Sequence, residues 1–115
     1  MTLKECYKIF GGNYENVVSR LVNEALVRKI LIKFLSDKSF ADILEKLKAD
    51  KPNDAFCSAH TLKGICQNLG FDNLLEPAVE VTEALRNGKN NTTPEMLENL
   101  KKRYEETISA IKELE

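Results

Sequence analysis

The chain has 115 residues, the usual length of one domain, and 43% of them are hydrophobic, enough to build a core. Its 17 basic and 18 acidic residues give a net charge of −1, so the chain lacks the positive excess that nucleic-acid binding requires. No stretch approaches the roughly 20 apolar residues that span a bilayer, and the first residues lack a signal-peptide pattern, so we expect a cytoplasmic protein that contacts no membrane.

The first predicted element is a short helix over residues 2–10, with Thr2 as its cap and Glu5 in a capping-box pattern. A pair of glycines ends it, and Asn13 can cap the next segment. From 14 to 35 apolar residues recur at helical spacing, and no glycine or proline marks a break. The sequence therefore leaves open whether 14–35 is one helix or two.

Four longer helical patterns follow, with Ser39, Asp72 and Thr93 as expected caps. The predicted helices cover residues 39–49, 52–69, 72–87 and 94–114. Pro77 is awkward in the third of them, which either starts later or has a distorted first turn. Short links favour antiparallel neighbours. We therefore predict an all-α fold, an up-down antiparallel four-helix bundle with additional N-terminal helices.

The segment 59–70 holds the only histidine of the chain, His60. At roughly 100° per residue, a helix places Lys63, Gly64 and Gln67 on the same side as this histidine. The apolar stripe of the helix lies on the far side and consists of Leu62, Ile65, Cys66 and Leu69. A lone histidine is more often a surface or core residue without a task, but this position disfavours the core.

Two neighbours of His60 favour a functional role over an ordinary surface position. A glycine in the middle of a helix costs about 1 kcal/mol relative to alanine, and Gly64 is such a residue. Lys63 shares the face of His60 and would repel an imidazolium. An anion carried on the imidazole and a closely approaching partner would explain both residues. Phosphorylation fits, because a phosphoryl group brings roughly two negative charges and strong acceptor oxygens.

The run His-Thr-Leu-Lys-Gly at 60–64, followed by Gly70, resembles the H-x-L-K-G signature of histidine-containing phosphotransfer (HPt) domains. The resemblance covers approximately residues 24–114, so we expect one HPt-like domain over 1–115, with 1–23 as an N-terminal helical extension. It implies a helical bundle that takes a phosphoryl group from the aspartate of one receiver domain and passes it to another. The implied partners are receiver domains of response regulators and hybrid histidine kinases in bacterial two-component phosphorelays, and we expect a monomer.

The resemblance makes His60 the phosphoryl acceptor. Phosphoryl transfer needs a neutral ring nitrogen that can be reached in line, and cations that stabilise the charge on the equatorial oxygens. Lys63, one turn further along, can offer its ammonium group to those oxygens; its alternative is an ordinary surface lysine. Gly64 leaves the helix surface flat for a docking partner.

Other candidate residues surround this centre. Gln67 and Phe56 are expected on the docking face together with Phe71, which has an equally good alternative role as a staple of the turn. In the family a polar side chain of the neighbouring helix often holds the non-reacting ring nitrogen. Thr82, with Glu83 beside it, occupies that place here, although a threonine is short for the task.

Several chemistries lack their sequence signatures. No glycine-rich nucleotide loop is present, so we expect a phosphoryl carrier without an ATP site, autokinase activity or cofactor. Magnesium, where transfer requires it, is expected on the partner receiver, because the face of His60 offers no carboxylate cluster. One histidine and three cysteines without a Cys-x-x-Cys pair argue against a metal site and a disulfide framework. Cys57 and Cys66 are expected to be small packing residues.

Two other functions stay open at this point. One is a phosphorylation-independent module that binds receivers or kinases as a scaffold or inhibitor through the same face. The other is a thiol-dependent enzyme that uses Cys57 one turn before His60. An acid-labile, base-stable phosphate on His60 separates phosphotransfer from both.

Overall fold

The computed structural model describes residues 1–114, and all regular structure in this range is helical. The elements are α1 (Leu3–Phe10), α2 (Tyr14–Arg20), α3 (Glu24–Phe34), α4 (Ser39–Lys48), α5 (Pro52–Leu69), α6 (Asp72–Ala84), the 3₁₀ turn η1 (Arg86–Gly88) and α7 (Pro94–Lys112). The all-α prediction is confirmed.

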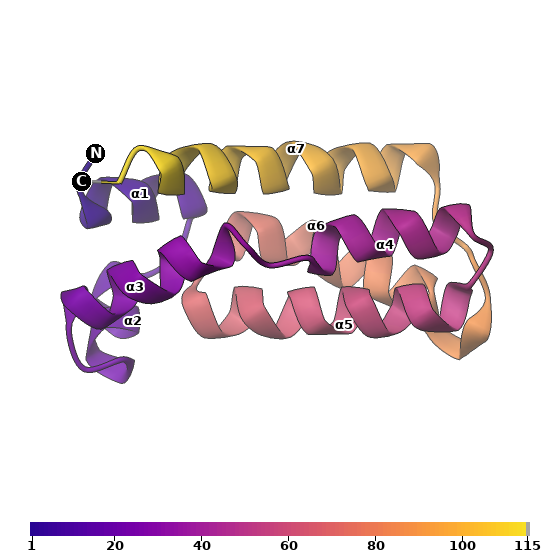
Figure 1. Cartoon of the computed structure of the whole chain (residues 1–115), viewed down its shortest axis with the longest axis horizontal. Coiled ribbons are helices and arrows are strands. Elements are labelled where there is room, and N and C mark those ends of the chain that lie inside the picture. The colour runs from indigo at the N-terminus through magenta and orange to yellow at the C-terminus, as the bar shows by residue number, and fades with distance from the viewer. Residues whose placement is uncertain (115) are drawn as a thin grey trace.

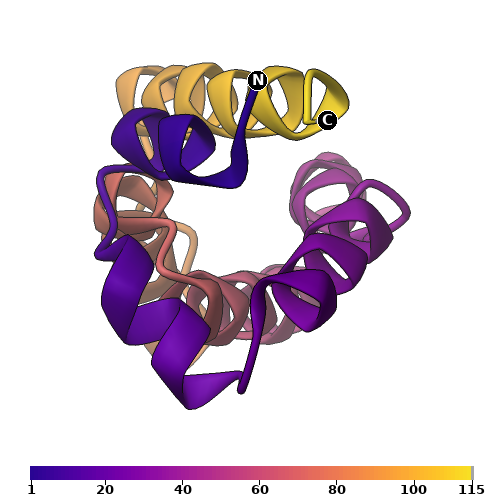
Figure 2. The ribbon, with the colours of Figure 1, turned by 90° about the vertical axis from the view of Figure 1, so that its left-hand side faces the viewer.

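Helices α4 to α7 form the antiparallel bundle, and their axes follow the long axis of the molecule (Figure 1). α5 packs against α4 and α6, and α6 packs against α7. Seen along the bundle, the helices surround a common interior (Figure 2), which buried apolar side chains fill. Phe40 of α4 and Tyr104 of α7 close the ring, since their side chains stack with centroids 4.2 Å apart.

The three N-terminal helices lie at one end of the bundle, where both chain ends also meet (Figure 1). The hydroxyl of Tyr7 in α1 donates to the carbonyl of Leu69 at 2.7 Å, and the guanidinium of Arg20 in α2 donates to that of Asn68 at 2.9 Å. The last turn of a helix leaves its carbonyl groups without partners inside the helix. Helices α1 and α2 therefore supply hydrogen-bond donors to the carbonyl groups at the C-terminal end of α5.

Residues 14–35 form two helices, which settles the alternative that the sequence left open. α2 ends at Arg20, and Val22 then adopts a positive φ of 81°. Asn23 caps α3, since its side chain accepts a hydrogen bond from the Leu26 N–H at 2.9 Å. A β-branched residue with positive φ is a backbone outlier. The helix break thus occurs at a residue type from which a break is not normally predicted.

The expected caps of three helices are confirmed. Thr2 and Glu5 make both hydrogen bonds of a capping box at the start of α1. Asn13 accepts from the Asn16 N–H at the start of α2, and Thr93 accepts from the Met96 N–H at the start of α7. These polar residues satisfy donors that a helix start leaves unpaired.

The expected caps of α4 and α6 are wrong. Ser39 is the first residue of α4, and the carboxylate of Asp37 accepts its N–H at 2.9 Å. Asp72 is already inside α6, and the preceding Phe71 makes no side-chain cap. Pro77 lies inside α6, so the helix does not start later. It ends at Ala84, earlier than expected, and the chain continues into η1.

Candidate functional site

α5 is amphipathic in the way that its sequence predicts. Its buried residues are Ala55, Ala59, Leu62, Cys66 and Leu69. On the opposite side His60, Gly64 and Gln67 are exposed, and Lys63 is half-buried. Gly70 ends the helix with a φ of 73°, a conformation that favours glycine, and its N–H donates to the Cys66 carbonyl. His60 therefore stands near the middle of a fixed helix and faces away from the core.

The imidazole of His60 has one aromatic neighbour, Phe56, one turn earlier in α5. Their ring centroids lie 6.0 Å apart with an interplanar angle of 43°. Within residues 1–114, no side chain forms a hydrogen bond with either ring nitrogen of His60. Both nitrogen atoms are therefore available to a partner.

A charged pair from the end of α6 lies beside the same aromatic ring. Arg86 Nε and Nη2 donate to Glu83 Oε2 and Oε1, each at 2.8 Å, so the guanidinium grips the carboxylate with two parallel bonds. The Arg86 Cζ atom lies 5.4 Å from the centroid of the Phe56 ring. The packing of η1 against α5 thus brings the guanidinium to the aromatic ring that adjoins His60.

Glu83 is influenced by both cations of this region. The hydrogen bonds from Arg86 lower the pKa of the Glu83 carboxyl, and the positive charges of Arg86 and Lys63 lower it further. The carboxylate is therefore ionised at neutral pH and interacts with the positive charges of both Arg86 and Lys63. Both of its oxygens accept hydrogen bonds from Arg86, and among residues 1–114 Glu83 makes no hydrogen bond with the imidazole.

Gly64 borders open space. A Cβ atom built on it would meet nothing within 4 Å, apart from its own helix backbone. Gln67, one turn later, is also exposed. The surface of α5 on the C-terminal side of His60 therefore has no large side chain at position 64 and a polar one at position 67. This agrees with the docking role predicted for these two residues.

Two predicted site residues lie elsewhere. Phe71 is fully buried at 0% exposure, with its ring centroid 4.8 Å from that of Phe10 and 5.1 Å from that of Phe34, so its expected docking role is wrong. Thr82 is also fully buried, and its hydroxyl donates to the Ala78 carbonyl at 2.6 Å. The turn after α5 carries Phe71 into the core, and Thr82 lies on the core side of α6. Thr82 is therefore not available to orient the imidazole.

The cysteines of α5 have opposite environments. Cys66 is buried, and burial raises the pKa of its thiol to about 12. Cys57 is exposed, so the expectation that it is a packing residue is wrong.

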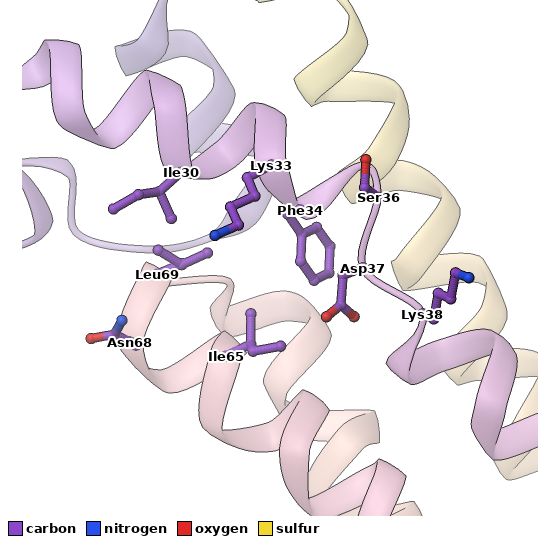
Figure 3. A pocket seen from close by; sticks show the side chains of 9 residues that line it. All are labelled: Ile30, Lys33, Phe34, Ser36, Asp37, Lys38, Ile65, Asn68 and Leu69. Carbon is purple, nitrogen blue, oxygen red and sulfur yellow. The ribbon is translucent and has the colours of Figure 1, made fainter.

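An open cleft of about 440 Å³ adjoins the C-terminal part of α5 (Figure 3). Ile30 and Phe34 of α3 contribute to its lining, together with Ile65 and Leu69 of α5. Lys33 and Asp37 add opposite charges. His60 does not line this cleft, and its side chain is exposed on the surface of α5.

Arg86 is the one member of the site that the sequence did not reveal. Its spacing of three residues from Glu83 is a visible signal for an ion pair on a helix. Its position over Phe56 depends on how α6 and η1 pack against α5, which no local pattern encodes.

An antiparallel bundle that exposes a histidine halfway along one helix is the arrangement of a histidine phosphotransfer domain. Comparison with protein-family models agrees, because the Hpt domain matches residues 32–113. The chain belongs to the HPt family, whose members take part in histidine phosphotransfer and interact with receiver domains in phosphorelays. Comparisons with curated proteins and with solved structures gave no match.

No helix within residues 1–114 combines the length and the apolar character that a membrane span needs. In the same part of the chain, no three or more His, Cys, Asp or Glu side chains are grouped so that they could hold a metal ion.

Proposed function

We propose that this protein is a phosphoryl carrier in which His60 accepts a phosphoryl group from a receiver aspartate and returns it to the aspartate of another receiver. One observation carries the proposal: the only histidine of the chain is exposed in the middle of α5, inside the family match. Because the apolar side of α5 faces the core, the histidine side is available to a partner as large as a domain.

The reaction exchanges one bond for another. A neutral ring nitrogen of His60 attacks the phosphorus, the N–P bond forms as the acyl O–P bond breaks, and the aspartate leaves as a carboxylate. The other ring nitrogen keeps its proton, so charge is conserved, and the reverse reaction with a second receiver restores the imidazole. Since the transition state is loose, positioning and cations provide most of the stabilisation.

Lys63 is the cation that we assign to the phosphoryl oxygens. It lies three residues after His60, and residues with this spacing are neighbours on a helix surface. Gly64 and Gln67 continue the same surface and are proposed to meet the receiver, with the half-buried Phe56 on the other side of His60. Magnesium, where it is needed, is assigned to the receiver.

The test is the transfer of labelled phosphate from a phosphorylated receiver domain to the wild-type chain and to His60→Gln. The wild type should acquire an acid-labile, base-stable phosphate, whereas His60→Gln should fold normally and acquire none. Glutamine is a good helix former, so an exposed position should accept it. Cys57→Ser is the matched control on the same helix and should take up label as the wild type does.

The outcomes separate the three candidate functions. Uptake by His60→Gln at the wild-type rate would refute His60 as the acceptor. Receiver binding by the wild type without any phosphate on His60 would favour the scaffold function. A loss of activity confined to Cys57→Ser would point to thiol chemistry.

A further inference from the structure

The carboxylate of Glu83 interacts with two cations, Arg86 and Lys63. Glu83 holds the guanidinium of Arg86 through two hydrogen bonds of 2.8 Å. Lys63 is close enough to Glu83 to favour its ionised form. Arg86 and His60 both adjoin the Phe56 ring, and Lys63 follows His60 by one turn of α5.

Arg86 contacts the aromatic ring next to His60 in addition to its ion pair with Glu83. Its Cζ atom lies 5.4 Å from the centroid of the Phe56 ring, and the centroid of the same ring lies 6.0 Å from that of His60. A cation at this distance from an aromatic ring is attracted to it. The ring would thus keep the guanidinium in the region of the imidazole even when its carboxylate partner changes.

The ion pair can be exchanged at low cost. The side chains of Arg86 and Glu83 are 48% and 50% exposed, and ion pairs in such positions contribute little to stability in water. A phosphoryl group offers more negative charge than a carboxylate and several acceptor oxygens. The planar guanidinium suits two parallel hydrogen bonds to either group.

Given the proposed role of His60 as phosphoryl acceptor, we propose that Arg86 leaves Glu83 and binds the phosphoryl group when His60 is phosphorylated. Glu83 then competes with this group for Arg86 and Lys63. No bond to phosphorus changes in this step, since the guanidinium only moves its N–H donors from carboxylate oxygens to phosphoryl oxygens. Glu83 therefore limits the share of phosphate that His60 retains at equilibrium and favours onward transfer to the next receiver.

The experiment measures the equilibrium constant for phosphoryl exchange between this chain and a receiver domain that phosphorylates the wild type. Concentrations are kept below those at which the two proteins form a complex. Glu83→Gln removes the competing charge and should shift the constant toward phosphorylated His60 by about three- to tenfold, with a smaller shift at high salt. Arg86→Gln should shift it the other way, and Arg86→Lys should restore part of the loss.

Glu80→Gln is the matched control, because it removes one negative charge from an exposed position of the same helix. Glu80 lies beside Thr93 and Glu95 at the start of α7, so its replacement should leave the constant within about twofold of the wild type. In the Arg86→Gln background, Glu83→Gln should raise the equilibrium constant by a smaller factor than in the wild type, because the two residues interact directly and their effects are not additive.

The possible results are distinct. An unchanged or lowered constant for Glu83→Gln, or an equal rise for Glu80→Gln, would overturn the competition. The competition would also be overturned if Glu83→Gln raised the equilibrium constant by the same factor in the Arg86→Gln background as in the wild type. A wild-type chain that takes up no phosphate on His60 would instead refute the proposed function itself.

Discussion

Gly64 is a position at which the stability of the isolated fold and the binding of a partner should favour different residues. It lies one turn after His60, and a Cβ atom at this position would contact nothing within 4 Å outside the local helix backbone. A glycine inside a helix adds conformational freedom to the unfolded chain and thereby lowers stability. The fold gains nothing from glycine here, so the reason for it should be found in a complex.

We expect Gly64→Ala to raise the free energy of unfolding by up to about 1 kcal/mol. Gly64→Gln should melt no lower than the wild type, because its side chain enters open space. It should nevertheless transfer phosphate poorly, since a misplacement near 1 Å can cost about 100-fold in rate. Melting temperature and the rate of transfer from a phosphorylated receiver are measured on the same preparations.

Gly70 provides the opposite control on the same helix. It has a φ of +73°, and an added Cβ would lie 2.8 Å from Val17 Cγ2, so Gly70→Ala should lower the melting temperature. If Gly64→Gln also melted well below the wild type, the open surface assigned to Gly64 would be wrong. If it transferred phosphate at the wild-type rate, its docking role would be wrong.

The residue pattern of α5 predicted which side of the helix is exposed, because a helix repeats every 3.6 residues regardless of its neighbours. His60, Gly64 and Gln67 are exposed for this reason. The same reasoning failed at Phe71 and Thr82, which depend on the path of the turn and the rotation of α6. Local periodicity describes a helix well, but it does not describe how two helices face each other.

At the scale of whole elements, the junction between α2 and α3 shows another limit of sequence reasoning. Breaks are usually recognised from glycine or proline, and neither occurs there. The caps of α1, α2 and α7 were predictable because each depends on one side chain and a nearby N–H. The break instead lies at Val22, whose positive φ is not signalled by its residue type, directly after the helix in which Arg20 binds the Asn68 carbonyl.

We expect Val22→Gly to stabilise the protein. Val22 has a φ of 81° and is 79% exposed, so the valine has an unfavourable backbone conformation and buries little surface. A left-handed conformation costs a residue with a Cβ roughly 1–2 kcal/mol, whereas glycine adopts it readily. After the greater entropy of the unfolded glycine chain is included, a gain of about 0.5–1 kcal/mol should remain. Urea unfolding measures it.

Val18→Gly is the matched control in the preceding helix. Val18 lies inside α2 and is half-buried, so glycine there should lower the free energy of unfolding by about 1 kcal/mol or more. Equal losses for both variants would mean that Val22 does not have a positive φ in solution.

At the scale of the whole molecule, contacts between distant parts of the chain join α1 to the bundle. Tyr7 is buried, and its hydroxyl donates to the Leu69 carbonyl, 62 residues away. Asn73 of α6 donates to the Ile9 carbonyl at 2.9 Å, and Cys6 donates to the Ala110 carbonyl. The cooperative unit should therefore include α1, although the family match begins only at residue 32.

This arrangement makes stability sensitive to alkaline pH. Burial raises the pKa of the Tyr7 hydroxyl well above its ordinary value of 10.0, and burial raises that of the Cys66 thiol from 9.0 to about 12. As the pH rises through 9 and then 10, the unfolded chain loses these protons while the folded chain keeps them. The unfolded state then binds fewer protons, so the free energy of unfolding decreases as pH increases.

Each of the two groups should lower the free energy of unfolding by up to about 1.4 kcal/mol per pH unit once its unfolded form has titrated. Urea unfolding between pH 8 and pH 11 gives this slope for the wild type and for Tyr7→Phe. The variant should be less stable at pH 8, because the Leu69 carbonyl loses its donor, but its stability should decrease less steeply above pH 10. Parallel curves for the two proteins above pH 10 would show that the Tyr7 hydroxyl reaches solvent in the folded state.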